Sequence, residues 1–196
     1  MSLPLALARI EQIERALVPQ PAATPTPAAA AAGGTASTAP VASASFARLL
    51  GAAGGSPMTT IAGAEVGQAE QPPGSNDSPR IAQYRTATAG SGVGPWCAYF
   101  VSWVARQAGS PLGDHGEGFG SVDALYAWAQ RAGRAVPNGP GVVPRPGDLI
   151  VWDEHIGIVE QVLPDGRIQT LEGNSGDRVS RNVHENSDAL GYVRMS

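Results

Sequence analysis

Residues 94–105 read GPWCAYFVSWVA, and this stretch contains the only cysteine of the chain. The glycine and proline before Trp96 are typical of a loop, whereas the apolar residues after Cys97 recur at helical spacing. We therefore predict a helix from about Trp96 to Ala108, ended by Gly109. Its buried face is expected to consist of Phe100, Val101, Val104, Ala105 and Ala108.

Two further helices are expected, one on each side of this one. The first follows Asn76 or Asp77 as its N-cap and runs through Tyr84, and the second runs from Ser121 to Gly133. After residue 147 the hydrophobic period falls from about 3.6 to 2, which indicates strands. Helices followed by antiparallel strands indicate an α+β domain, with the N-terminal helices packed on a sheet of about five strands. The strands are expected at residues 149–152, 155–163, 167–174, 178–184 and 191–194.

Composition divides the chain into three segments. Residues 1–18 have apolar side chains three and four apart, which predicts an amphipathic helix. This helix either docks on a protein partner, another copy or the later domain, or it stays unattached or packs on itself. Residues 19–68 are mostly Ala, Pro, Gly, Ser and Thr, which predicts a disordered linker. Residues 69–196 contain all four tryptophans and all four tyrosines and are the predicted folded domain. Deletion of residues 1–67 is therefore expected to leave a folded domain.

Composition also argues against several classes of protein. The formal net charge is −4 and the pI is near 5.3, so we expect no basic face for nucleic acid. No apolar run reaches the roughly 20 residues of a membrane-spanning helix. The start of the chain lacks a basic leader, so no standard secretory signal is expected. A single cysteine forms no internal disulfide, and no Cys and His residues have zinc-binding spacing.

Cys97 lies in the first turn of the predicted helix, where unpaired backbone N–H groups favour a thiolate. The same N–H groups can bind the oxyanion that forms when a thiolate attacks an acyl carbonyl. A lone cysteine is more often a buried apolar residue. Here, however, the apolar face of the helix is already supplied by residues about one turn later. We therefore predict that Cys97 is a nucleophile.

A cysteine nucleophile needs a base, and the chain has three histidines. His115 lies in a glycine-rich stretch that cannot fix its ring, and His184 lies in a polar strand where we expect it to be exposed. His155 opens the second predicted strand, so the sheet can hold its ring. His155 is therefore the predicted base.

The hairpin between the second and third strands indicates which residues accompany the base. A two-residue turn at Asp165 and Gly166 places Glu172 and Asn174 on the same face as His155. A register shifted by two residues keeps this face, and it sets Asn174 opposite His155 with Glu172 diagonal to it. Either polar group could then orient the imidazole. Glu172 can also be read as a solvated strand carboxylate and Asn174 as a turn residue, and a β-bulge would break the argument.

Four blocks of the sequence occur in this order: PWCAYFVSWVARQAG, PRPGDLIVW, HIGIVEQV and TLEGNSG. With these blocks, residues 76–194 resemble the CHAP domain, an amidohydrolase and peptidase family of the NlpC/P60 and papain-like superfamily. The resemblance implies a papain-like α+β fold that cleaves amide bonds in peptidoglycan, as an N-acetylmuramoyl-L-alanine amidase or a peptide endopeptidase. It also implies that Cys97 is the nucleophile and His155 the general base. By the same resemblance, Glu172 is the orienting carboxylate and Asn174 an assisting group.

The resemblance also sets expectations for ligands and location. The acidic cluster that binds calcium in some phage members has no counterpart in TAGSGVGPWC, so we predict no metal, and we expect no cofactor. The expected substrate is a peptidoglycan stem peptide or crossbridge, with Trp96 and Trp152 in contact with it. We expect a monomer that acts in the cell envelope or outside the cell, exported by a flagellar apparatus or carried in a phage particle.

Two other functions stay open at the level of sequence. One is a catalytically silent module for wall binding or assembly that keeps the fold. The other is a cysteine acyltransferase or toxin that acts on a peptide outside the cell wall.

Overall fold

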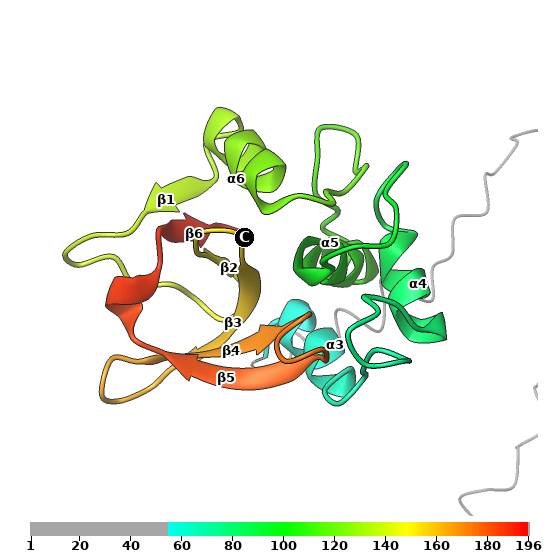
Figure 1. The fold of residues 1–196 in the computed structure, drawn as a ribbon. Coiled ribbons are helices and arrows are strands. Elements are labelled where there is room, and N and C mark those ends of the chain that lie inside the picture. Colours follow the sequence, from blue (N-terminus) through cyan, green and yellow to red (C-terminus); the bar gives the residue numbers. More distant parts are fainter. Residues whose placement is uncertain (1–54, 196) are drawn as a thin grey trace, which may run out of the picture. The chain divides into compact units, whose positions relative to one another are not determined.

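The computed structural model of the chain describes residues 55–195. Within this range, four α-helices precede a six-stranded antiparallel sheet (Figure 1), which confirms the predicted α+β class. The predicted helix at residues 1–18 and most of the predicted linker lie outside the described residues. No helix in residues 55–195 is long and apolar enough to cross a membrane. The elements are α3 (Pro57–Ala64), α4 (Pro79–Arg85), α5 (Cys97–Gln107), α6 (Val122–Arg131), β1 (Ala135–Pro137), β2 (Leu149–Val151), β3 (Ile156–Val162), β4 (Ile168–Glu172), β5 (Ser180–His184), the 3-10 helix η1 (Asn186–Asp188) and β6 (Gly191–Val193).

The strands lie in the order β1-β6-β2-β3-β4-β5. The sheet has one strand more than predicted, because β1 pairs with β6 after α6. This strand was missed because it is only three residues long and ends at Pro137, in a stretch that otherwise has the composition of a loop.

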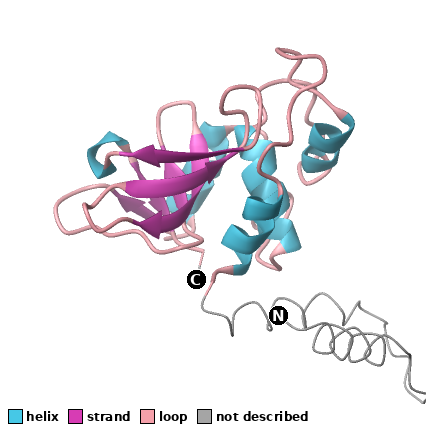
Figure 2. Ribbon diagram, turned by 90° about the horizontal axis from the view of Figure 1, so that it is seen from below, coloured by secondary structure: helices cyan, strands magenta, loops and turns pink. Residues whose placement is uncertain are grey.

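The two faces of the sheet carry different apolar clusters. α5 lies between the sheet and α4 (Figure 1) and packs against β3 and β4. In the view from below, the strands lie beside the group of helices (Figure 2). Because side chains alternate along a strand, one set faces α5 and the other set points away from it. The first set includes Leu149, Val151, Ile156, Ile158 and Leu171, and the second includes Ile150, Val159, Ile168 and Tyr192.

Helix α3 corrects the predicted end of the linker at residue 68. Ser56 caps this helix, Pro57 occupies its first turn, and Met58 and Ala62 are buried in the main core. Composition concealed the helix because most of its residues are small. The folded region therefore begins near Ser56, and deletion of residues 1–67 would remove part of the core.

Two buried carboxylates in the segment after α3 form hydrogen bonds with α4 and with the residue before α5. Glu65 accepts hydrogen bonds from Arg80 Nε at 2.7 Å and from the Tyr84 hydroxyl at 2.6 Å. Burial opposes the charge on Glu65, but these two partners outweigh it and hold the pKa of Glu65 below its usual value. Glu70 accepts a hydrogen bond of 2.9 Å from Trp96 Nε1, immediately before α5. Residues 65–70 thus help to fix the start of α5.

The four helices differ in how they begin. Ser56, Ser78 and Ser121 each accept a hydrogen bond from a first-turn N–H of α3, α4 and α6. Ser78, rather than one of the two residues before it, therefore caps α4. By contrast, α5 begins after Trp96, and no side chain of the described residues caps it. The first-turn N–H groups of α5 are left without the partner that a capping side chain supplies to the others.

Candidate active site

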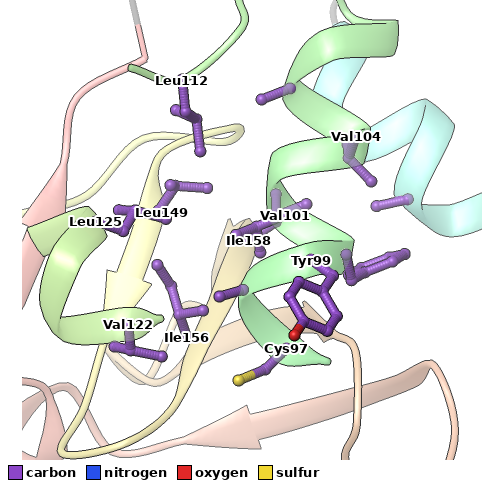
Figure 3. Close-up of a cluster of buried hydrophobic side chains, with 14 of the residues drawn as sticks. Cys97, Tyr99, Val101, Val104, Leu112, Val122, Leu125, Leu149, Ile156 and Ile158 are labelled. Carbon is purple, nitrogen blue, oxygen red and sulfur yellow. The ribbon is translucent and has the colours of Figure 1, made fainter. Parts of the chain in front are cut away.

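Cys97 is the first residue of α5 and is a free thiol. Figure 3 shows it at the end of the helix, as a member of the buried cluster that also contains Val122 and Ile156. Cys97 is 4% exposed, so most of the residue is packed. It also lines a pocket of about 400 Å³, and this pocket opens to solvent beside the sulfur-bearing end of α5.

The walls of this pocket come from three parts of the chain. Pro95 and the first turn of α5 form one side, and the start of α6 forms another. Glu154, in the turn between β2 and β3, completes the lining. The complete lining is Pro95, Cys97, Ala98, Tyr99, Gly120, Ser121, Val122, Asp123 and Glu154.

His155 lies at the start of β3, directly after a tight turn. The turn is closed by a 2.9 Å hydrogen bond from the Trp152 N–H to the His155 carbonyl. Glu154 within the turn has a φ of 58°, a left-handed conformation that non-glycine residues adopt infrequently. The turn places His155 directly after Glu154, which lines the pocket. The His155 side chain is 29% exposed.

Glu172, the last residue of β4, is 1% exposed and makes three side-chain hydrogen bonds. Its Oε2 lies 2.9 Å from His155 Nε2. Its Oε1 lies 2.6 Å from His184 Nε2 and accepts a 2.5 Å hydrogen bond from Thr170 Oγ1. Burial by itself would raise the pKa of Glu172, but the bonds from His155, Thr170 and His184 outweigh it and lower the pKa to about 2. Glu172 is therefore ionised at neutral pH.

The pKa of His155 moves in the opposite direction. Burial opposes the imidazolium, but the interactions with Cys97 and Glu172 are stronger and raise the pKa of His155 to about 9. An imidazolium next to a carboxylate is the expected state of this pair at neutral pH.

The state of Glu172 fixes the tautomers around it. An ionised carboxylate only accepts hydrogen bonds, so His155 and His184 must each donate from Nε2–H. This leaves Nδ1 of His155 as the ring nitrogen available to Cys97. The cysteine, the imidazole and the carboxylate can therefore act in series, with one ring nitrogen serving each neighbour.

The observed register explains how Glu172 reaches His155. Leu163 pairs with Arg167 around a three-residue loop, not the predicted two-residue turn. A bulge between Val159 and Gln161 shifts the pairing by a further residue. The two shifts add up to two residues, so the face is kept, and the predicted diagonal relation of Glu172 to His155 is the one observed.

Gly157 makes room for this diagonal contact. A Cβ added at Gly157 would lie 2.8 Å from Glu172 Cγ and 3.5 Å from Trp152 Cζ3. The stem of Glu172 thus crosses the strand where there is no side chain.

The remaining predicted site residues have different surroundings. Trp96 is fully buried, stacks on Tyr84 and donates to Glu70, so the prediction that it contacts substrate is wrong. Trp152 is partly buried and stacks on His155, with ring centroids 5.5 Å apart. Asn174 has a φ of 58° and makes no side-chain hydrogen bond recorded within residues 55–195. Its assisting role therefore stays a prediction.

His184 was missed by the sequence analysis, which expected an exposed side chain. It bonds to Glu172 and packs against Trp152 with ring centroids 4.6 Å apart. The pairing of Ile168 with His184 places it on the same face as Thr170 and Glu172. A predicted register for the hairpin of β4 and β5 would have placed His184 beside Glu172. The polar composition of β5 instead suggested an exposed side chain. His115 is exposed and makes none of the contacts described for His155 and His184.

No group of three or more His, Cys, Asp or Glu side chains within the described part of the chain is arranged to hold a metal ion. His155 instead bonds to Glu172 at 2.9 Å, and Cys97 and Glu172 together raise the pKa of His155.

Comparisons with known proteins bear on the same segment. A search of curated proteins and a search of solved structures each found no match to the chain. The family model of the CHAP domain matches residues 88–174, a range that begins before α5 and ends just after β4. Cys97, His155 and Glu172 all lie inside it. The match is consistent with a CHAP domain in this part of the chain, and the α+β fold fits the papain-like fold that the resemblance implied.

Proposed function

We propose that this protein is a cysteine amidohydrolase that cleaves amide bonds of peptidoglycan through an acyl-enzyme on Cys97. CHAP domains are in general hydrolytic domains that act on the cell wall as amidases or peptidases. The finer activity is either that of an N-acetylmuramoyl-L-alanine amidase or that of an endopeptidase on the stem peptide or crossbridge.

The observation that supports the proposal best is that the His155 ring bonds to Glu172 and interacts with both Cys97 and Glu172 strongly enough to raise its pKa to about 9. The thiol lies at the start of α5, and α5 is the only one of the four described α-helices that lacks a capping side chain. The imidazole is held by a carboxylate that is nearly fully buried. A packed cysteine without a function would need neither the open N-terminus nor the ion pair.

The first step is attack of the Cys97 sulfur on the carbonyl carbon of the scissile amide. Because the pKa of His155 is about 9, the ring carries a proton at neutral pH. The attacking species of a cysteine nucleophile is the thiolate, and a neighbouring imidazolium favours that form. The oxyanion that forms is stabilised by the uncapped first-turn N–H groups of α5. His155 therefore acts first as a general acid rather than as a base.

The second half completes the turnover. His155 gives its Nδ1 proton to the leaving amine as the C–N bond breaks, which leaves a thioester on Cys97 and a neutral ring. The ring then takes a proton from water while the water oxygen attacks the thioester. The carboxylic acid product leaves, and the thiolate and imidazolium are restored. Glu172 keeps the ring in one tautomer throughout.

We propose the cell envelope or the outside of the cell as the place of action, since the substrate lies there. Peptidoglycan is the partner that the domain implies. The predicted helix at residues 1–18 is proposed to dock a protein partner, and flagellar export or carriage in a phage particle remains part of this proposal.

The chain allows a direct test, because Cys97 is its only cysteine. Purified peptidoglycan should lose turbidity with the wild-type chain and keep it with Cys97→Ala. Iodoacetamide should add one carbamidomethyl group and abolish the activity in parallel. The melting temperature of Cys97→Ala, compared with wild type, controls for loss of fold.

The products distinguish the remaining functions. Mass spectrometry of the digest should reveal new amine termini in muropeptides, and their position separates an amidase from an endopeptidase. Equal loss of turbidity with wild type and a folded Cys97→Ala would refute catalysis by this thiol. No loss with either protein would favour a silent wall-binding module.

A further inference from the structure

The second histidine at the site, His184, lies outside the segment that matches the CHAP family model, which ends at residue 174. It is the last residue of β5 and pairs with Ile168 of β4. Its Nε2 is 2.6 Å from Glu172 Oε1, and its side chain is 29% exposed. The mechanism described above assigns it no step.

The two oxygens of Glu172 have separate partners. Oε2 faces His155, whereas Oε1 accepts from both His184 and Thr170. A free carboxylate rotates readily about its terminal torsion, which has broad minima. Two donors on Oε1 define the plane of the carboxylate, and this plane directs Oε2 at the His155 ring.

Trp152 connects the same two histidines on their other side. Its ring stacks on His155 at an interplanar angle of 26° and lies against His184 at 52°. His155, Glu172, His184 and Trp152 therefore form a closed ring of contacts. Displacement of one imidazole would disturb the other through both the carboxylate and the indole.

We propose that His184 is a positioning residue, which holds the Glu172 carboxylate in the orientation that aligns and charges His155. The inference rests on the proposed function for its catalytic consequence. The positioning itself concerns only the described side chains. The ionisable groups involved are Cys97 and Glu172 around His155, and Glu172 around His184.

The test compares two substitutions in the full chain. His184→Phe keeps an aromatic ring against Trp152 but removes the donor, whereas His184→Gln keeps an N–H donor. Val183→Ala is the matched control, because Val183 is the preceding residue of β5 and its side chain is exposed. Each variant is assayed for peptidoglycan hydrolysis, and the His155 ring is titrated by NMR.

His184→Phe should lower kcat about 10-fold with little change in KM, the low end of the loss of about 10- to 100-fold that follows removal of the groups that orient metal-binding histidines. The pKa of His155 should fall from about 9 towards its ordinary value of 6.5. His184→Gln should recover most of both effects, and Val183→Ala should change neither.

Two outcomes would overturn the inference. One is a His184→Phe variant with wild-type kcat and wild-type titration of His155. The other is equal impairment of the Phe and Gln variants with an equal loss of melting temperature, which would mean that His184 only packs. If the wild-type chain hydrolyses no peptidoglycan, the proposed function fails, but the titration of His155 still decides the role of His184.

Discussion

The substitution Gly157→Ala tests the site through its packing rather than through its reactive groups. The new methyl carbon would lie 2.8 Å from Glu172 Cγ, whereas carbon atoms pack at about 3.5–4.0 Å. The Leu171 carbonyl at 3.4 Å and Trp152 Cζ3 at 3.5 Å leave the methyl group no free direction. Glu172 must therefore move by roughly 0.7–1.2 Å, since the closely packed strand backbone cannot.

This displacement has two expected costs. Overpacking of a buried site destabilises a protein by about 1–3 kcal/mol, which lowers the melting temperature by roughly 2–12 °C for a chain of this length. A misplacement of about 1 Å in a catalytic group lowers the rate about 100-fold. Since Oε2 of Glu172 would leave His155, the pKa of His155 should also fall below about 9.

The measurements are thermal unfolding, loss of peptidoglycan turbidity and NMR titration of His155. Gly139→Ala is the control, because no atom lies within 4 Å of the added Cβ there and its backbone is not left-handed. We expect this control to match wild type in all three measurements. A Gly157→Ala variant with wild-type stability, rate and His155 titration would refute the contact between Gly157 and Glu172 as described.

Three further predictions follow from the same residues. Glu172→Gln should slow hydrolysis about 10- to 100-fold, because a hydrogen bond to a charged group worth about 1.5–3 kcal/mol is lost. Steady-state kinetics would measure this loss. An unchanged rate would leave the orienting role to another residue. The His155–Glu172 pair should stabilise the fold most between about pH 4.5 and 6.5, which urea unfolding across pH can measure. Above pH 6.5 the contribution of His155 to the free energy of unfolding should decline until about pH 9, because its pKa is raised. Below pH 4.5 the contribution of Glu172 should decline towards pH 2, because its pKa is lowered. A stability that does not change with pH would contradict both shifts. Deletion of residues 1–54 should preserve cooperative unfolding, whereas deletion of residues 1–67 should lower the melting temperature because it removes Met58 and Ala62 from the core; equal melting of the two truncated chains would contradict the core role of α3.

The elements that could be predicted from sequence are those whose buried apolar residues recur at a regular spacing. Helix α5 and strands β2 to β4 carry apolar residues at clear periods of 3.6 or 2, so their type and order followed directly. Helix α3 has no such stripe, since Met58 and Ala62 are its only buried residues. Ser56 followed by Pro57 is nevertheless a good helix start, and this capping signal would have revealed α3 where hydrophobicity did not.

The site residues could be predicted only from their position in a predicted helix and from the alternation of side chains along a strand. Cys97 follows from its place at the start of a helix, and Glu172 follows from the face it shares with His155. The length of the hairpin loop and the bulge could not be read from composition, and the face was kept only because the two irregularities add up to two residues. Trp96 could not be assigned, because its partner Glu70 lies 26 residues earlier.

The start of α5 is where local helix stability and the proposed chemistry favour different residues. A serine, threonine, asparagine or aspartate at an N-cap stabilises a helix by about 0.5–2 kcal/mol relative to alanine, and the other three described helices have serine there. In α5 this position is Trp96, whose indole is directed into the core and held by Glu70. Eight buried residues anchor α5 against the sheet and α4, so tertiary packing replaces the missing cap. A capping side chain would occupy the N–H groups that the proposed oxyanion needs, next to the sulfur of Cys97. The burial of Trp96 therefore allows a helix to present an open N-terminus to a substrate without unwinding.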